Sequence, residues 1–190
     1  MITMRETKLQ GVVELVPTRH GDERGFLSET YNAAELARYG IATRFIQDNH
    51  SLSRKTGVIR GLHYQVPPFA QAKLVRVTRG RVLDVAVDIR KGSPTYAQWV
   101  ALELSADKWN QLFIPEGFAH GFATLEPDSE LLYKVSSQYS REHDRAIRFD
   151  DPQIGVDWQV ADMQPIISQR DATAPVLADA ENPFEYRAET

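Results

Sequence analysis

The chain has 190 residues, a net charge of -4 and no cysteine. The acidic balance disfavours nucleic acid or an anionic membrane surface as a partner, and the missing cysteines exclude disulfides, thiolate metal sites and cysteine nucleophiles. The N-terminal residues lack the apolar run of a signal peptide, and no stretch approaches the ~20 apolar residues of a membrane span. We therefore expect a soluble cytoplasmic protein. We also expect one domain over residues 1–190, with an N-terminal strand segment and a loosely patterned C-terminal segment after about residue 150.

Short runs of β-type residues recur along the chain, with Gly, Pro and Asp between them. This density of strands predicts an all-β sandwich or jelly-roll barrel. The predicted strands cover residues 11–16, 25–31, 45–51, 58–64, 73–78, 81–89, 98–104, 111–114, 118–125 and 130–135. Helical signals are few. Asn32 is suited to cap a short helix over residues 33–39 that ends at Gly40, and a second short helix is predicted to begin near Ser168.

Alternation of apolar and polar residues is clearest in the strand predicted over residues 81–89. The aliphatic side chains from Leu83 to Ile89 share one face, and Asp84 and Asp88 take the other. We therefore expect one face of this strand to belong to the core.

Two predicted strands carry histidine where an aliphatic residue would be usual: His63 in RGLHYQ (60–65) and His120 in IPEGFAHGF (114–122). A buried imidazole must find a hydrogen-bond partner or lose stability. Each is either a core histidine bonded to a backbone carbonyl or part of a site inside the barrel. Alternation places His120 on one face with Phe118 and Phe122, and we favour a site for both histidines.

The spacing around both histidines suggests a double-stranded β-helix of the cupin type. In cupins, two motifs carry metal ligands, H-x-H with a later Glu and P-x-G-x-x-H. The second motif is present as Pro115, Gly117 and His120, but the first has Gln65 at its second ligand position and no Glu in PPFAQAK (67–73). Because catalytic metal sites keep about three protein ligands, we infer a pocket that holds no metal.

Lys73 and Tyr133 complete the set of candidate catalytic side chains. Lys73 shares parity with Val75 and Val77, which points its ammonium inward, and Tyr133 alternates with Leu131. Each alone indicates little, because lysine at a strand end usually extends to water and tyrosine usually packs its ring. An imidazole, an ammonium and a phenol together suit proton abstraction next to a carbonyl. The base removes the proton, the cation stabilises the enolate and the phenol returns a proton to the opposite face.

The sequence resembles the dTDP-4-dehydrorhamnose 3,5-epimerase family of deoxysugar biosynthesis. The motifs that carry the resemblance span nearly the whole chain: GDERGF (21–26), QDNHS (47–51), RGLHYQ (60–65), KLVRVTRG (73–80), DVAVDIRKGSPTYAQW (84–99), IPEGFAHGF (114–122), LLYK (131–134) and RDATAP (170–175). The resemblance implies epimerisation at carbons 3 and 5 of dTDP-4-keto-6-deoxy-D-glucose without a cofactor, in dTDP-L-rhamnose biosynthesis. It also implies a homodimer.

The resemblance further implies roles for individual residues. His63 would be the base, with Asp171 hydrogen-bonded to it, Lys73 would stabilise the enolate oxygen, and Tyr133 would be the acid. The residues implied to contact the sugar, the diphosphate or the nucleotide are Arg24, Phe26, Glu29, Gln47, Asp48, Asn49, Arg60, Lys73, His120, Tyr139, Asp144 and Arg170. Among them, Phe26 would lie near the nucleotide, and Tyr139 would stack on the thymine.

Two positions depart from a simple match. Asp144 stands where the family usually has Glu, and its side chain is one methylene shorter. Arg60 and His63 have opposite parity, which in a regular strand would send them to opposite faces. A bulge or a strand end at Gly61 would let both face the same side.

Two alternatives remain open at the level of sequence. One is an epimerase that acts on a single centre, carbon 3 or carbon 5, of a related sugar. The other is a non-catalytic sugar-binding cupin, which would not need Lys73, Tyr133 and a pair of His63 with Asp171 together.

Overall fold

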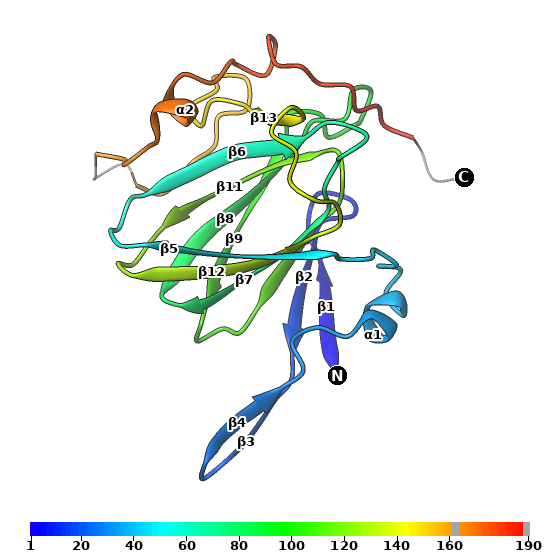
Figure 1. Cartoon of the computed structure of the whole chain (residues 1–190), viewed down its shortest axis with the longest axis vertical. Helices are drawn as coiled ribbons and strands as arrows, with labels where there is room; N and C mark the ends of the chain where they lie inside the picture. The colour runs from blue at the N-terminus through cyan, green and yellow to red at the C-terminus, as the bar shows by residue number, and fades with distance from the viewer. Residues whose placement is uncertain (161–163, 188–190) are drawn as a thin grey trace.

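The computed structural model describes residues 1–160 and 164–187, and in it two antiparallel β-sheets face each other (Figure 1). The first sheet contains, from edge to edge, β1 (Ile2–Glu6), β2 (Val13–Pro17), β10 (Gln111–Ile114), β7 (Lys73–Arg79), β12 (Ser129–Val135) and β5 (Gln47–Ser53). The second contains β13 (Asp144–Ala146), β6 (Ile59–Gln65), β11 (Phe118–Thr124), β8 (Arg81–Asp88) and β9 (Trp99–Ser105). The prediction of an all-β jelly-roll fold is confirmed.

A separate hairpin and two short helices complete the described structure. The hairpin pairs β3 (Arg19–Asp22) with β4 (Gly25–Ser28). Helix α1 (Ala33–Ala37) is capped by Asn32, as predicted, but ends two residues before the predicted Tyr39. Helix α2 (Gln169–Ala172) begins next to Ser168, as predicted, and Ser168 is its cap. No helix in the described residues is long and apolar enough to cross a bilayer.

Every strand predicted from the sequence has a counterpart whose bounds lie within two residues, except that the strand predicted over residues 25–31 already ends at Ser28. Three observed strands were not predicted: β1, β3 and β13. β3 has the sequence RHGD and is exposed throughout, so it offers no alternation of apolar and polar residues. β13 has only three residues. Such strands depend on pairing with a neighbour rather than on their own pattern.

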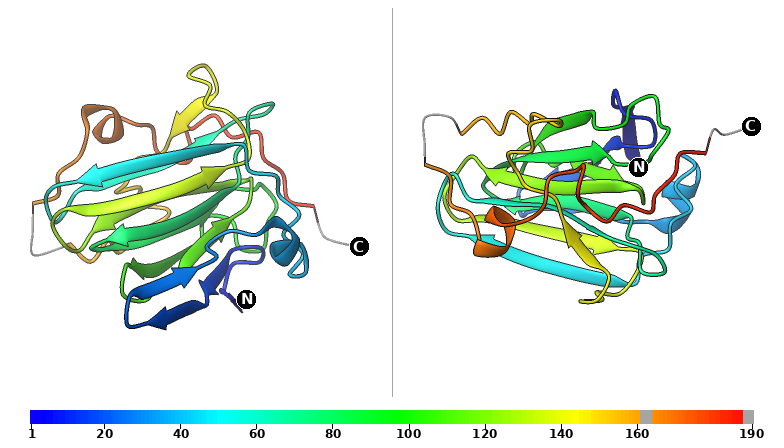
Figure 2. Two further views of the ribbon diagram at one scale, coloured as in Figure 1. Left: turned by 60° about the horizontal axis from the view of Figure 1, so that its bottom comes forward. Right: turned by 90° about the horizontal axis from the view of Figure 1, so that it is seen from above.

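The main core lies between the two sheets. Val75 and Leu131 of the first sheet pack with Val82, Phe118 and Phe122 of the second in one buried cluster. Two further clusters cover the outer faces. Strands β1 and β2 pack with helix α1 on one side, and the segment after residue 150 packs on the other. Figure 2 shows this C-terminal segment running along the outer side of the second sheet.

The aliphatic face of β8 belongs to the core, as predicted, and the acidic face is buried as well. The aliphatic face, with Val85 and Val87, packs against the C-terminal segment through residues such as Trp158. The acidic face points toward the barrel interior, where Asp84 and Asp88 have no exposed surface. Buried carboxylates need partners. Asp84 binds His120, and Asp88 binds Arg90, Ser93 and Thr95.

A bulge at Gly61 brings Arg60 and His63 to the same side, as their opposite parity required. In the β6–β11 ladder His63 lies opposite His120, but Arg60 lies opposite Phe122, so β6 has one residue more than β11 in this interval. Gly61 has φ +122°, a conformation that side chains rarely adopt. The bulge therefore turns the side chains of Arg60 and His63 to the same side of β6. Its backbone conformation accounts for the glycine at position 61.

We expect Gly61→Ala to destabilise the fold by several kcal/mol, because a Cβ would lie 2.6 Å from the Gly121 Cα and 2.7 Å from the His120 carbonyl oxygen. Gly92→Ala is the matched control. Gly92 has φ +80°, but a Cβ added there would meet no atom within 4 Å, so this variant carries backbone strain of about 1–2 kcal/mol alone. Urea unfolding measures both. Equal losses of stability would show that the close approach at Gly61 is unimportant.

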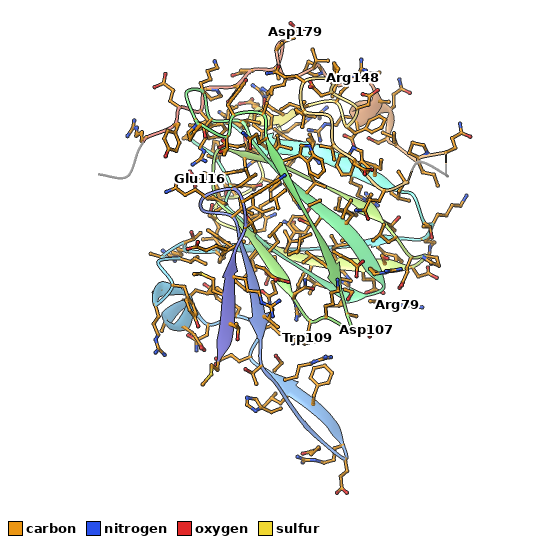
Figure 3. The ribbon with its side chains drawn as sticks, turned by 180° about the vertical axis from the view of Figure 1, so that it is seen from behind. Arg79, Asp107, Trp109, Glu116, Arg148 and Asp179 are labelled. Carbon is orange, nitrogen blue, oxygen red and sulfur yellow. The ribbon has the colours of Figure 1, made fainter. Side chains whose placement is uncertain are left out.

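The β3–β4 hairpin projects away from the barrel, and a small cluster at its base holds it there (Figures 1 and 3). The Trp109 ring meets the Phe26 ring edge-on at 4.9 Å, and its indole N–H donates to Ser28 Oγ at 2.9 Å. The Arg19 guanidinium lies over both rings. Between Phe26 and Ser28 in β4, Leu27 is 76% exposed, so the hairpin presents apolar surface to its surroundings.

Candidate active site

A cavity of about 230 Å³ opens at one end of the barrel, between the edge strands of the two sheets. Side chains from β5, β6, β7, β12 and β13 line it, together with residues from the loops beyond them. Most of the site residues predicted from the sequence are among them: Gln47, Asn49, His63, Lys73, Tyr133, Tyr139, Asp144 and Arg170. An adjoining cavity of about 340 Å³ also contains His63 and Arg170, and adds Arg60 and Asp171.

His63 and Asp171 form a hydrogen-bonded pair. His63 Nε2 lies 2.7 Å from Asp171 Oδ1, and the Gly61 amide donates to the other carboxylate oxygen at 3.4 Å. Helix α2 positions Asp171, which is 3% exposed, in its first turn, where the Ser168 hydroxyl accepts from the Asp171 amide. Burial alone raises the pKa of Asp171, but the hydrogen bonds from His63 and Gly61 outweigh it and hold the pKa below its ordinary value. The carboxylate is therefore ionised beside the imidazole.

Lys73 is the most buried cation of the cavity. It is 8% exposed, and its Nζ lies 3.4 Å from the His63 carbonyl oxygen. Its side chain points into the barrel with Val75 and Val77, as parity predicted. Burial lowers the pKa of Lys73 to about 8, against the opposing effect of the charges on Asp84 and Asp144.

His120 is buried opposite His63 in the β6–β11 ladder and is bonded to Asp84, a residue to which the sequence had assigned no role. His120 Nε2 lies 2.9 Å and 3.1 Å from the two Asp84 carboxylate oxygens. Burial lowers the pKa of His120 although Asp84 opposes the shift. The sequence did carry a signal, because Asp84 interrupts the aliphatic run of a strand whose two faces are both buried.

Tyr133 reaches the same cavity from β12, where it lies directly opposite Asn49 of β5. Burial raises the pKa of the Tyr133 phenol, and the nearby Arg60 charge partly opposes the shift. Arg60 itself donates to Ser53 Oγ and to the Leu52 carbonyl, both at 3.3 Å. The phenol is therefore protonated at neutral pH and faces a cationic side chain.

Three residues form a hydrogen-bonded group at the mouth of the cavity. Arg170 Nη2 lies 2.8 Å from Asp144 Oδ2, and the Tyr139 hydroxyl donates to the same oxygen at 3.1 Å. Beside them, Gln47 accepts from the Tyr139 amide at 3.3 Å and donates to Asn49 at 2.9 Å. The Tyr139 ring is 58% exposed, so one of its faces is available for stacking.

Five of the predicted binding residues line neither this cavity nor the adjoining one. One of them, His120, is buried beside Asp84. Asp48 lies between Gln47 and Asn49 in β5 and therefore points to the outer face of the sheet, where it pairs with Lys134 at 2.8 Å. Arg24, Phe26 and Glu29 lie on or next to the projecting hairpin and are exposed. Within one chain, the structure does not bring these residues to the cavity.

The donor set of the cavity does not fit a catalytic metal ion. Gln65 Nε2 donates to the carbonyls of Phe69 and Gln138, and its Oε1 accepts from the Ser140 amide, so both ends of this side chain are occupied. The Nε2 atoms of both histidines are bonded to carboxylates. In the described part of the chain, no three His, Asp or Glu side chains are grouped as metal ligands.

Comparisons with known proteins agree on one family. The family model for dTDP-4-dehydrorhamnose 3,5-epimerase matches residues 6–179. The enzyme of that name from Salmonella typhimurium is 48% identical over 181 residues, which cover 95% of this chain and 98% of the relative. A crystal structure of the Legionella pneumophila dTDP-6-deoxy-D-glucose-3,5-epimerase in complex with dTDP-4-keto-L-rhamnose superposes with a TM-score of 0.94. It is 41% identical and covers 99% of this chain and 100% of that chain.

A more distant solved structure is a 3'-monoepimerase from Streptomyces bikiniensis in complex with dTDP-quinovose. It is 33% identical, with a TM-score of 0.84, and covers 92% of this chain and 88% of that chain. Both kinds of epimerase therefore share the fold, a jelly roll of the cupin type, while the double epimerases named above are more similar in sequence. This chain belongs to the dTDP-4-dehydrorhamnose 3,5-epimerase family.

Proposed function

We propose that the protein is a dTDP-4-dehydrorhamnose 3,5-epimerase, which inverts carbons 3 and 5 of dTDP-4-keto-6-deoxy-D-glucose without a cofactor and serves dTDP-L-rhamnose biosynthesis. Membership of the family supports the reaction. The observation that carries the proposal is the convergence of a carboxylate-bound imidazole, a buried ammonium and a buried phenol on one cavity, from His63, Lys73 and Tyr133. These are the groups that proton removal next to a ketone requires.

His63 is the proposed base, and the lone pair that accepts the proton is on Nδ1. Neutral histidine has one N–H, and a carboxylate only accepts, so the 2.7 Å contact requires Nε2 to carry the hydrogen that is donated to Asp171. Nδ1 is then unprotonated. The adjacent Asp171 charge stabilises the imidazolium that forms when Nδ1 takes the proton from carbon 5 or carbon 3.

Lys73 is proposed to stabilise the enolate oxygen at carbon 4. The ammonium lies in the barrel interior, where a charge interacts more strongly than in water. Tyr133 is proposed as the acid that protonates the opposite face of the enolate. Its raised pKa keeps the phenol protonated until the enolate forms, and the charge of Arg60 stabilises the phenolate that remains.

Substrate binding is assigned to the polar residues around these three. Arg60 and Arg170 are proposed to contact the diphosphate and the sugar through charge-assisted hydrogen bonds, together with Gln47, Asn49 and His120. The exposed ring of Tyr139 is proposed to stack on the thymine. Asp144 is proposed to contact the nucleotide, although in the described structure it binds Arg170 and Tyr139.

The proposed reaction is tested by incubation with dTDP-4-keto-6-deoxy-D-glucose and NMR of the product. Inversion at carbons 3 and 5 is expected, with dTDP as a competitive inhibitor. Inversion of one centre would instead support the alternative favoured by the likeness to the 3'-monoepimerase. Binding without any inversion would support a non-catalytic sugar-binding cupin.

We propose that the protein is a homodimer in which each hairpin enters the partner's cavity. Three observations support this arrangement. The hairpin projects from its own barrel (Figure 1), Phe26 is 55% exposed, and the family's motif residues Arg24, Phe26 and Glu29 are distant from the cavity of their own chain. A partner subunit would give these residues the substrate contacts that the resemblance implies.

Mixed dimers test this arrangement. Arg24→Ala and His63→Ala chains, co-expressed with different tags and purified together, are expected to regain activity that neither homodimer has. One of the two sites then combines an intact His63 with the intact Arg24 of the other chain. If Arg24 served its own chain's cavity, each site would keep one defect and the mixed dimer would stay inactive.

We also propose that the chain is one cytoplasmic domain. The two sheets share one core, and the C-terminal segment packs onto it through buried residues such as Ile154 and Leu177. The absence of cysteine is in keeping with a reducing compartment.

A further inference from the structure

Asp84 is a fully buried carboxylate next to the proposed active site that the mechanism above does not use. It has no exposed surface, although its neighbours in the middle of β8, from Val82 to Val87, are all apolar. An unpaired buried charge costs several kcal/mol, and a buried pair is seldom more stable than apolar residues of the same size. Stability alone therefore does not account for an aspartate at this position.

Two buried groups that can carry a positive charge interact with Asp84: His120, which it binds, and Lys73, whose pKa its charge raises. Asp84 lies opposite Phe122 of β11, and its carboxylate binds the His120 imidazole with both oxygens. His120 lies opposite His63 in the β6–β11 ladder, and Lys73 Nζ lies 3.4 Å from the His63 carbonyl. One carboxylate thus stands near two groups that can each carry a positive charge.

Burial determines whether Lys73 or His120 carries the positive charge. Lys73 and His120 are 8% and 7% exposed, so two cations with one anion would leave a net charge in a region of low dielectric. The pKa of His120 is lowered by burial, whereas that of Lys73 falls only to about 8. These pKa shifts favour Lys73 over His120 as the group that carries the positive charge.

We propose that Asp84 is a positioning residue of the reaction, whose one carboxylate fixes His120 as a neutral donor from Nε2 and holds Lys73 as an ammonium. The proposal rests on the proposed function, since it concerns the group that stabilises the enolate. A neutral His120 with its hydrogen on Nε2 has Nδ1 free to accept a hydrogen bond from a sugar hydroxyl. The cationic lysine remains available to the carbon 4 oxygen.

Other charged and titratable groups face Lys73 and could set its protonation in place of Asp84: Asp144, His63, Tyr133 and Arg170, all lining the cavity. The second carboxylate, Asp144, also raises the pKa of Lys73, but it is bound to Arg170 at 2.8 Å, so its charge is already offset. The partner of Asp84 is a neutral histidine, so the charge of Asp84 is not offset by a bound cation. This charge therefore stabilises the ammonium form of Lys73.

The test is Asp84→Asn, with two measurements. An opposite charge within about 4–6 Å changes a pKa by about 1–3 units, so removal of this carboxylate is expected to lower the pKa of Lys73 by at least about one unit. NMR of lysine labelled with ¹³C and ¹⁵N measures this pKa in the substrate-free protein, with Lys73→Met to assign the signal. The alkaline limb of the kcat profile is expected to move to lower pH by the same amount.

Asp88→Asn is the matched control. Asp88 lies on the same face of β8 and is equally buried, but it binds Arg90, Ser93 and Thr95. This variant is expected to lose stability and to leave the Lys73 pKa and the alkaline limb unchanged. A Lys73 pKa in Asp84→Asn equal to the wild-type value would overturn the proposal. The NMR titration needs no turnover, so an inactive wild-type protein would contradict the proposed function without deciding this inference.

His120→Gln provides a second arm if Asp84→Asn does not fold. Glutamine keeps a donor for Asp84 and removes the competing imidazole. If His120 is neutral, the pKa of Lys73 is expected to stay within about half a unit of the wild-type value. A rise of a full unit or more would show that His120 had carried the positive charge, and would overturn the proposal.

Discussion

Replacing His63 by alanine is expected to lower kcat by about 10²- to 10⁴-fold, because no other base is placed to accept the substrate proton. Exchange of substrate hydrogens with deuterated water should fall in the same proportion, since proton removal itself is lost. The His63 side chain is 31% exposed and lies at the cavity wall, so the variant is expected to keep the fold. Steady-state kinetics and NMR exchange measure the two effects.

Two further variants make this result specific. Asp171→Asn keeps the hydrogen-bonded shape but removes the charge that stabilises the imidazolium, so a smaller loss of the same kind is expected. His50→Ala is the control, because His50 lies on the outer face of β5 and pairs with Glu130 at 3.0 Å. Its activity should equal that of the wild type. Exchange at the wild-type rate in His63→Ala would show that another group is the base.

Replacing Tyr133 by phenylalanine is expected to separate proton removal from inversion. The variant keeps the ring, the base and Lys73, so the enolate still forms and His63 returns a solvent-derived proton to the face from which it took one. The expected product is deuterated substrate with unchanged configuration at the centre that depends on Tyr133, which we assign to carbon 5. Water is expected to reprotonate the second centre slowly. NMR in deuterated water resolves both label and configuration.

A purely structural role of Tyr133 leads to a different outcome. If the ring only packs between the sheets, Tyr133→Phe would keep wild-type stereochemistry and lose about 1 kcal/mol of stability at most from the missing hydroxyl. Inversion at both centres at the normal rate would exclude the phenol as the acid. Comparison of the urea unfolding midpoints separates a loss of stability from a loss of chemistry.

The parts of the site that follow local pattern were predictable from sequence. Strand parity alone placed Lys73 inside the barrel with Val75 and Val77, and the conflict between Arg60 and His63 predicted the bulge at Gly61. Both inferences use only the two-residue period of a strand and the conformational freedom of glycine. The caps of the two short helices follow from equally local hydrogen bonds.

The parts that depend on contacts between distant strands were not predictable in the same way. The pairing of Asp84 with His120 joins residues on neighbouring strands β8 and β11, and no local pattern reports it. Asp48 is a different case. Alternation within β5 already separates it from Gln47 and Asn49, but the resemblance assigned all three residues to the site together. The resemblance alone brought the hairpin residues into the site, and one chain does not place them there.

The proposed reaction is the removal and return of protons at both carbon 3 and carbon 5 in one cavity. It is tested most directly by following dTDP-4-keto-6-deoxy-D-glucose with the wild-type enzyme in deuterated water by NMR over time. We expect deuterium at both positions, inverted configuration at both, and loss of both labels in His63→Ala. Label at only one position would contradict the claim of a double epimerase, and inversion without label at either position would contradict proton exchange through His63 and Tyr133.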